Sequence, residues 1–225
     1  MARFFSIEGL DGSGKATASR LVCQTLTSLG CKVLNISFPN YGKTKSSALI
    51  SDLLNFRFGP IEDLSVYFSS TLYSLDRYET LRESLDNLHS FDCVLFDRYT
   101  PSNIAYHCAR VPQSQWPALS AWIEEFEYHR LALPRLELSF HLDVGMETSS
   151  ALVREKALRA YTPLQLDAFE QNKPMLSRAR EAYRYMIDNG IGSMRWHNVD
   201  LMPHATLRTP DSISQEIVDA IFEVR

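Results

Sequence analysis

The chain has 225 residues, of which 45% are hydrophobic and 22% charged, a composition typical of a folded globular protein rather than a disordered or fibrous one. Its 23 basic and 27 acidic side chains give a net charge of -4, which excludes an overall positive field that would draw it to nucleic acid or an anionic membrane. The four cysteines include no C-x-x-C pair, so we expect reduced thiols in a cytoplasmic protein, with nuclear entry left open.

The first segments of the chain predict a strand, a glycine-rich loop, a helix and a second strand. Residues 4–8 form a short apolar run, and residues 9–14 contain three glycines. Apolar residues then recur at helical spacing over 18–29, and Gly30 is expected to end that helix in a left-handed conformation. Residues 32–36 read as the next strand, which completes a βαβ unit.

Helices and short buried strands are expected to alternate along the rest of the chain. Residues 61–89 lack internal Gly and Pro and predict one long helix, and residues 93–96 predict a buried strand that runs into Asp97. The later elements are expected helices at 116–133, 177–187 and 209–224 and expected strands at 136–142 and 195–199.

This alternation predicts an α/β fold with three α/β/α layers, in which a five-stranded parallel sheet carries helices on both faces. We expect a single domain over residues 1–225, because no linker or repeat divides the chain. The least regular long stretch, at about 149–174, is charged and interrupted by Pro163 and Pro174, and it is expected to be a mobile insert.

Residues 9–15 match the pattern G-x-x-x-x-G-K directly after a predicted strand and at the head of a predicted helix. That context indicates a phosphate-binding P-loop, in which backbone N–H groups, the helix N-terminus and Lys15 attract nucleotide phosphates. The phosphate-binding residues would be Gly9, Asp11, Gly12, Ser13, Gly14, Lys15, Ala16 and Thr17.

The P-loop departs from its usual pattern at Ala16, where a serine or threonine hydroxyl ordinarily binds Mg²⁺. Thr17 lies about 100° further round the helix and is poorly placed to replace it. Our hypothesis is that Mg²⁺ keeps an extra water there, or is held mainly by the nucleotide and acidic side chains.

Asp97 and Arg98 follow a buried strand whose carboxyl end meets the same sheet edge as the P-loop. Asp97 is the candidate metal residue, although strand-end acids often cap a turn instead. The guanidinium of Arg98 is shaped to hold a phosphate in two parallel hydrogen bonds, and its alternative is a surface ion pair.

Tyr73 and Arg77 lie four residues apart on the predicted long helix and therefore share one face. That face offers an aromatic ring that can stack on a base and a guanidinium group that can hydrogen-bond to it. Spacing alone favours core packing for both. Tyr67, Phe68 and Tyr78 are the stronger candidates for the core on that helix.

Three basic residues, Arg154, Lys156 and Arg159, fall within six positions of the irregular insert. Such a run is usually a solvated face. Beside a P-loop, it also predicts a lid that closes over the phosphates and excludes water.

Taken together, these segments resemble the thymidylate kinase family of P-loop nucleoside-monophosphate kinases over most of the chain. The resemblance is carried by residues 7–15, 38–41, 73–78, 97–103, 126–127 and 133–134, of which 97–103 (DRYTPSN) is the most specific. It implies a homodimer that transfers the γ-phosphoryl group of ATP to thymidine monophosphate (dTMP) with Mg²⁺.

The resemblance also implies individual roles. Tyr73 would stack on thymine, Arg77 would hydrogen-bond it, and Asp11 would approach the 3'-hydroxyl. The expected dTMP-binding residues are Asp11, Phe38, Pro39, Tyr41, Tyr73, Arg77, Arg98, Ser102, Asn103 and Tyr106. The expected catalytic residues are Lys15, Asp97, Arg98, Arg154 and Arg159.

Three departures from the family accompany this resemblance. Tyr41 stands where many members have an arginine, with Lys43 and Lys45 as candidate substitutes, and Ala16 is the second departure. The third is that the P-loop has no arginine, so the lid must supply that charge; Tyr161, Phe169 and Glu170 are further candidates for sugar or metal contacts. Two other functions stay open: a deoxynucleoside kinase on the same fold, and a nucleotide-binding protein with little catalysis.

Overall fold

The structure, a computed structural model, describes all residues except 1, 89, 145–168, 170–171, 204–205 and 225. The described residues form a sheet of five strands in the order β2-β3-β1-β4-β5, and every pairing is parallel. The strands are β1 (Arg3–Glu8), β2 (Val33–Ser37), β3 (Cys93–Asp97), β4 (Leu138–Asp143) and β5 (Trp196–Asp200). The predicted five-stranded parallel sheet is confirmed, with strand bounds within two residues of those expected.

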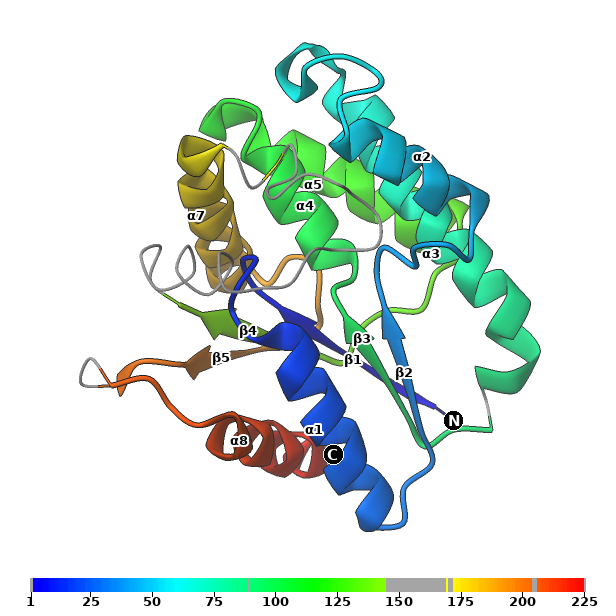
Figure 1. Ribbon diagram of the computed structural model, residues 1–225, viewed down its shortest axis with the longest axis vertical. Helices are drawn as coiled ribbons and strands as arrows, with labels where there is room; N and C mark the ends of the chain where they lie inside the picture. The colour runs from blue at the N-terminus through cyan, green and yellow to red at the C-terminus, as the bar shows by residue number, and fades with distance from the viewer. Residues whose placement is uncertain (1, 89, 145–168, 170–171, 204–205, 225) are drawn as a thin grey trace.

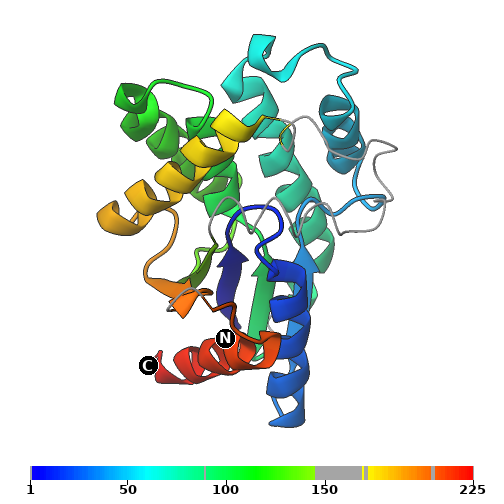
Figure 2. The same ribbon diagram turned by 60° about the vertical axis from the view of Figure 1, so that its left-hand side comes forward.

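Helices cover the sheet on both sides and give three layers (Figures 1 and 2). On one side lie α1 (Lys15–Ser28) and α8 (Pro210–Glu223), which pack against each other. On the other lie α2 (Lys45–Leu54), α3 (Val66–Leu88), α4 (Thr100–Cys108), α5 (Trp116–Glu124) and α7 (Lys173–Asn189). None of the described helices combines the length and apolar character that crossing a membrane requires.

Strand β3 is apolar on both faces, which explains why it reads as a continuous hydrophobic run. Phe5 and Ile7 belong to the cluster that α1 and α8 cover, together with Leu95 of β3. The alternate residues of β3, Val94 and Phe96, belong to a second cluster on the opposite face. This period of two is the geometry of a strand buried on both sides.

The expected helix over 61–89 is wrong at its start. A 3-10 turn covers Ile61–Asp63, Leu64 is extended, and α3 begins only at Val66. The guanidinium of Arg110 donates to the carbonyls of Ile61 and Leu64 and so ties the turn ahead of α3 to a distant part of the chain. A long-range contact of this kind leaves no periodic signal in the local sequence.

Other expectations also require correction. Helices α2 and α4 were not expected; α2 begins behind Thr44, whose side chain accepts from the Ser47 N–H as an N-cap. Tyr67 and Phe68 are not core residues, because they are 48% and 43% exposed on the outer side of α3. Apolar character alone did not identify the buried face of that helix.

The expected helix over 116–133 divides into α5 and a π-helical segment, Glu125–Arg130. The Leu131 N–H donates to the Phe126 carbonyl five residues earlier, at 2.9 Å, which marks the wider turn. Such widened turns frequently occur at functional sites. The segment ends before Ala132, which has a positive φ of 52°.

Candidate active site

The P-loop follows β1 at the carboxyl edge of the sheet and is shaped by three glycines in positive-φ conformations. Gly9, Gly12 and Gly14 have φ values of 140°, 82° and 86°. A Cβ atom on Gly9 would lie 2.7 Å from the carbonyl oxygen of Leu142, so only glycine fits there. The Lys15 side chain is buried beneath the loop, and its Nζ donates to the Leu10 carbonyl at 2.6 Å. Ala16 and Thr17 are exposed at the start of α1.

Arg98 links the P-loop to the neighbouring cavity. It adopts a left-handed backbone conformation with φ 69°, an unusual state for an arginine and a frequent mark of a functional position. Its Nη1 donates to the Gly9 carbonyl at 3.1 Å, and its Nη2 donates to Asp11 Oδ1 at 2.7 Å. Burial lowers the pKa of Arg98, but Asp11, Tyr106, Tyr183 and Asp97 together outweigh burial and hold that pKa well above its ordinary value.

A buried carboxylate, Glu8, supports this arrangement from below. The Glu8 carboxylate accepts hydrogen bonds from the Tyr99 N–H at 2.8 Å and from the Ser102 hydroxyl at 2.6 Å. The Ser102 oxygen in turn accepts a hydrogen bond from Arg98 Nη1 at 3.0 Å. Burial raises the pKa of Glu8, an effect that these hydrogen bonds and the charge of Arg98 oppose. Glu8 therefore fixes the start of α4 and one side of Arg98 together.

A cavity of about 220 Å³ opens beside the P-loop and brings together all ten residues that the sequence analysis assigned to dTMP binding. Its lining consists of Asp11, Phe38, Pro39, Tyr41, Tyr73, Arg77, Arg98, Ser102, Asn103 and Tyr106, with Ser37, Leu54, His107 and Phe169. The expected residues come from four separate segments of the chain, at 11, 38–41, 73–77 and 98–106. Their convergence is a property of the fold that no local stretch contains.

Aromatic rings form one wall of this cavity. Tyr106 and Phe169 meet edge to face with ring centroids 5.5 Å apart, and Tyr73 lies 5.7 Å from the ring of His107. The Tyr106 hydroxyl donates to Asp11 Oδ2 at 2.9 Å, and the Arg98 guanidinium lies 5.3 Å from the Tyr106 ring centroid. The wall is therefore aromatic, and Tyr106 anchors it to Asp11 and Arg98.

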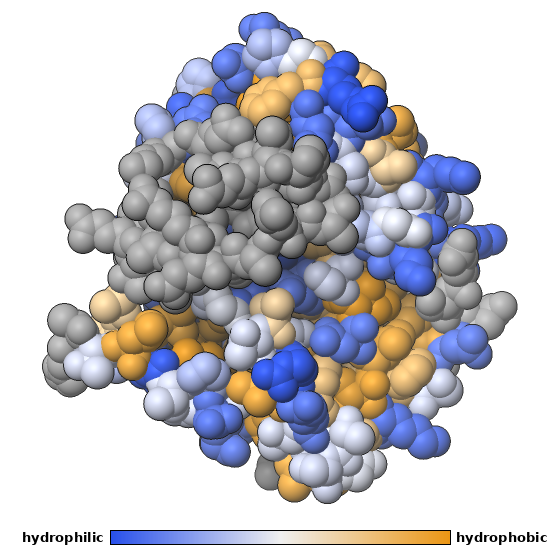
Figure 3. All heavy atoms as spheres, in the orientation of Figure 1, coloured by the Kyte–Doolittle hydropathy of each residue, from blue (hydrophilic) through white to orange (hydrophobic). Residues whose placement is uncertain are grey.

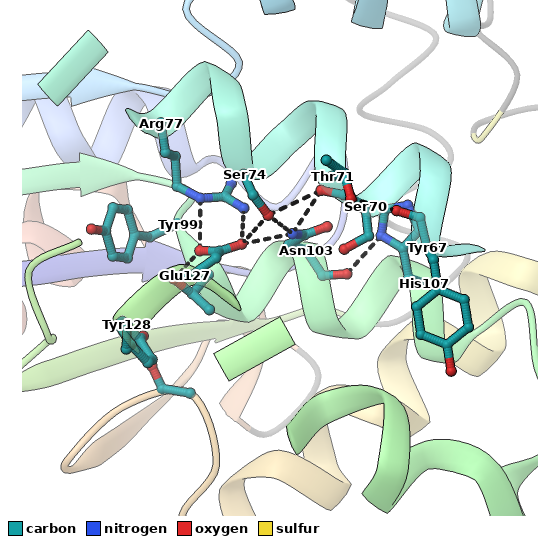
Figure 4. Close-up of polar contacts among 12 residues, drawn as sticks. Tyr67, Ser70, Thr71, Ser74, Arg77, Tyr99, Asn103, His107, Glu127 and Tyr128 are labelled. Atoms are coloured by element: carbon teal, nitrogen blue, oxygen red, sulfur yellow. Dashed lines mark hydrogen bonds and ion pairs between the residues drawn. The ribbon is translucent and has the colours of Figure 1, made fainter. Parts of the chain in front are cut away.

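The floor of the cavity is a polar network centred on Glu127, which lies in the π-helical segment (Figure 4). Glu127 forms a buried ion pair with Arg77 of α3 and accepts hydrogen bonds from Ser74, Thr100 and Asn103. Burial opposes the charge on Arg77, but the Glu127 carboxylate outweighs it, so the pKa of Arg77 is raised.

The loop that carries Phe38, Pro39 and Tyr41 is tied to α3 by Asp76. The Asn40 N–H donates to Asp76 Oδ2 at 2.9 Å, and the Thr44 hydroxyl donates to Asp76 Oδ1. Burial raises the pKa of Asp76, while these two hydrogen bonds oppose the rise. Helix α3 therefore positions both Tyr73 and Arg77 and the loop that lies across the cavity from them.

Asp97 lies at the carboxyl end of β3, in register with Ile7 and Ser37, and is largely buried. It is not part of the cavity lining. Arg154, Lys156, Arg159, Tyr161 and Glu170 lie outside the described residues. Lys43 and Lys45, the candidate substitutes at the Tyr41 departure, are exposed and do not line the cavity.

Several site residues were missed by reasoning from the residues alone. Glu127, Ser74 and Thr100 entered only within segments of the family resemblance, and His107 was not considered. A single charged residue between two aromatics, Phe126 and Tyr128, was the available signal for Glu127. Charged residues are almost never fully buried unless paired, and the sequence does not identify the partner.

The site combines a glycine loop and a buried lysine at the edge of a parallel sheet with an adjacent cavity that is lined by an arginine. This combination defines a P-loop phosphotransferase. Comparisons with known proteins identify its family. The thymidylate kinase family model matches residues 7–186.

Named relatives agree with this assignment. Thymidylate kinase from Mycobacterium tuberculosis (strain CDC 1551 / Oshkosh) is 30% identical over 211 residues, covering 92% of this chain and 97% of the relative. Thymidylate kinase from Methylobacillus flagellatus is 27% identical and covers 99% and 98%. The structure of thymidylate kinase from Candida albicans shares the fold, with a TM-score of 0.72 at 20% identity over 99% of this chain and 92% of that one. The chain belongs to the thymidylate kinase family.

His107 generates a prediction about pH. Burial, with a smaller contribution from Arg110, lowers the pKa of His107 to about 3. Below pH 6.5 the unfolded chain therefore binds a proton at this position that the folded chain does not bind, so stability falls as the pH falls. Between pH 7 and pH 5, this one residue should remove about 2 kcal/mol from the free energy of unfolding.

Urea unfolding at pH 7 and pH 5, for the protein and for His107→Gln, measures this contribution. The variant should lose about 2 kcal/mol less than the parent over that interval. An imidazole of His107 that titrates by NMR near pH 6.5 would contradict the prediction.

Proposed function

We propose that the protein transfers the γ-phosphoryl group of ATP to dTMP, giving ADP and thymidine diphosphate. The observation that carries the proposal is the position of Arg98, which contacts the P-loop carbonyl of Gly9 and at the same time lines the cavity. A guanidinium at that junction can hold an acceptor phosphate next to the donor's terminal phosphate. Membership of the thymidylate kinase family supports the same reaction.

The ATP phosphates would be held by the P-loop. Its backbone N–H groups and the N-terminus of α1 provide partial positive charge, and Lys15 provides a full one. Lys15 Nζ donates to the Leu10 carbonyl at 2.6 Å and to the Ser13 hydroxyl at 3.4 Å. A phosphate oxygen is a stronger acceptor for an ammonium group than a neutral carbonyl or hydroxyl oxygen.

The residues present fit a magnesium ion that is held mainly by nucleotide and water. Asp97 supplies one carboxylate at the strand end, Ala16 supplies no hydroxyl, and the described residues contain no cluster of three or more metal-binding side chains. Mg²⁺ usually keeps several waters and binds proteins through one or two carboxylates plus substrate phosphates. When bound, it neutralises charge on the phosphates; Asp97 would hold it and lie near the attacking oxygen.

The acceptor needs no strong base, because a phosphate monoester has a second pKa of about 6 and is already largely dianionic at neutral pH. The barrier is repulsion between two anions. Arg98 would reduce it by clamping the acceptor phosphate, and Lys15 by stabilising charge on the transferred group. Tyr73 would stack on thymine, Arg77 would hydrogen-bond it, and Asp11 would meet the 3'-hydroxyl.

Further charge would come from Arg154 and Arg159, which we propose belong to a lid at about 149–174 of a single domain, residues 1–225. The sequence motivates this assignment, since the P-loop itself carries no arginine. Closure of such a lid would exclude water from the phosphates and so disfavour hydrolysis of ATP. We also propose a cytoplasmic location, consistent with four free cysteine thiols.

The experiment that tests the function is ADP release with Mg·ATP, measured with the monophosphates of thymidine, deoxyuridine, deoxycytidine and deoxyguanosine, and with thymidine itself. Selective turnover of dTMP is expected. Turnover of thymidine alone would indicate a deoxynucleoside kinase, whose neutral hydroxyl acceptor needs a base. Nucleotide binding without turnover would indicate a binding protein and would make Ala16 the first position to change.

Substitution of Arg98 tests the role that carries the proposal. Arg98→Ala should lower turnover of dTMP by about 10³-fold or more, comparable to the loss of an arginine that stabilises phosphoryl transfer elsewhere. ATP binding, measured by equilibrium fluorescence or calorimetry, should survive because the P-loop residues remain. Intact turnover with weakened ATP binding would contradict this role. Arg20→Ala, on the outer face of α1, is the matched control.

We propose that the protein is a homodimer that associates through the outer side of α3. Phe58, Tyr67 and Phe68 are 39%, 48% and 43% exposed, and Phe58 packs edge to face on Phe68. In Figure 3, apolar residues are exposed among polar ones at the upper end of the molecule, where α2 and α3 lie in Figure 1. Burial of a contiguous apolar surface drives such association.

Light scattering measures the mass in solution. The parent protein should have the mass of two chains, and Phe68→Glu should shift it to one, because a buried unpaired carboxylate opposes association. Phe222→Glu, at a 53% exposed position on α8, should leave the mass unchanged. A single-chain mass for the parent would overturn the proposal.

A further inference from the structure

Tyr183 of α7 is a buried tyrosine that lies outside the cavity. Its hydroxyl oxygen lies 2.8 Å from Ser102 Oγ and 3.3 Å from Glu8 Oε2. Burial and the charge of Glu8 raise the pKa of Tyr183, against the smaller opposing effects of Arg98 and of hydrogen bonds with Ser102 and Gly9. The phenol therefore keeps its proton at neutral pH, and a buried proton of this kind needs an acceptor.

The distances around Ser102 assign the direction of each hydrogen bond. A serine hydroxyl has one proton and two lone pairs. Ser102 donates its proton to Glu8 Oε2 at 2.6 Å, a length typical of a hydroxyl that donates to a carboxylate. Since that proton is used, the phenol of Tyr183 must be the donor in its 2.8 Å contact with Ser102. Arg98 Nη1 donates to the other lone pair at 3.0 Å.

The Ser102 oxygen is therefore saturated, with one hydrogen bond donated and two accepted. A rotation of this hydroxyl away from Arg98 would also break its bonds to Glu8 and Tyr183. The acceptor that receives Arg98 Nη1 is thus held from two sides, by β1 through Glu8 and by α7 through Tyr183.

The ring of Tyr183 is itself held against the sheet. It stacks on His141 of β4, with ring centroids 4.8 Å apart and planes inclined by 30°. His141 Nδ1 lies 2.8 Å from Asn198 Oδ1 of β5, and burial lowers the pKa of His141, so the imidazole is neutral. Because the phenol oxygen is rigidly attached to the stacked ring, this packing also fixes the hydroxyl.

We infer that Tyr183 is a positioning residue that acts through Ser102 to fix the Arg98 guanidinium where it holds the acceptor phosphate. Arg98 also donates to the Gly9 carbonyl and to Asp11, so loss of the Tyr183 hydroxyl should loosen the guanidinium without releasing it. The inference rests on the proposed function, since it concerns the phosphate of the proposed acceptor.

The test is equilibrium binding of dTMP and of thymidine, which differ only in the phosphate, to the parent protein and to Tyr183→Phe. This substitution removes the hydroxyl and keeps the ring that stacks on His141. The ratio of the two affinities should fall by about 10-fold, the order expected for one hydrogen bond in a network that holds a charged group. The affinity for thymidine should not change.

A merely structural Tyr183 would weaken the binding of both ligands by the same factor, and an unchanged ratio would overturn the inference. Tyr185→Phe is the matched control on the same helix, because its ring packs on Trp116 with centroids 5.5 Å apart. It should leave the ratio at the parent value.

A double variant shows whether the effect passes through Arg98. Arg98→Ala should remove the contribution of the phosphate, so that adding Tyr183→Phe changes the ratio by less than about twofold. An effect of Tyr183→Phe that persists in full without Arg98 would contradict the inference. Should Tyr183→Phe fail to fold by thermal unfolding, Ser102→Ala carries the same test, since it removes the link itself; an unchanged ratio there would be equally decisive against it.

The proposed function and this inference fail in different ways. If the parent binds dTMP more tightly than thymidine but does not phosphorylate it, the proposed function fails while the binding ratio still tests Tyr183. If the parent phosphorylates dTMP and the ratio is insensitive to Tyr183→Phe, the function stands and the inference fails.

Discussion

Two buried carboxylates, Glu8 and Glu127, set the constraint on which the site depends, because a charge removed from water must be met by donors. Around Glu127 the donors include Arg77 and Asn103, and beneath Arg98 the Ser102 hydroxyl bridges to Glu8. Three of the residues that satisfy the carboxylates, Arg77, Ser102 and Asn103, also line the cavity. Each carboxylate therefore limits the side-chain conformations that these lining residues can adopt.

The parallel sheet supplies the other half of the construction. Parallel pairing brings the carboxyl ends of β1, β2 and β3 to one edge, so the P-loop, the loop after Ser37 and the Asp97–Arg98 pair all emerge together. The helices α3 and α4 then supply the residues that face them. The P-loop and the Asp97–Arg98 pair therefore lie at strand ends, whereas Tyr73, Arg77 and Asn103 lie on packed helices.

This division explains how much the sequence could predict. The P-loop and the strands were predictable because their signals are local: a fixed glycine spacing and short buried runs. The ten cavity residues were assigned through family resemblance, and the fold places them together, but their roles remain predictions. The start of α3 and the importance of Glu127 were not predictable, since both depend on contacts with distant residues: Arg110 with the carbonyl of Leu64, and Glu127 with Arg77.

The Arg77–Glu127 pair also carries an argument about why charge is kept in the protein interior. Burying two ions costs several kcal/mol each, and replacing a buried pair with well-packed apolar residues is often neutral or stabilising. Stability alone therefore gives little reason for an ionised network beneath the cavity. An apolar network of the same shape would present no hydrogen-bonding groups to the cavity. The Arg77–Glu127 pair instead fixes such groups there, because the Glu127 carboxylate accepts from both Arg77 and Asn103 Nδ2, and both of these residues line the cavity.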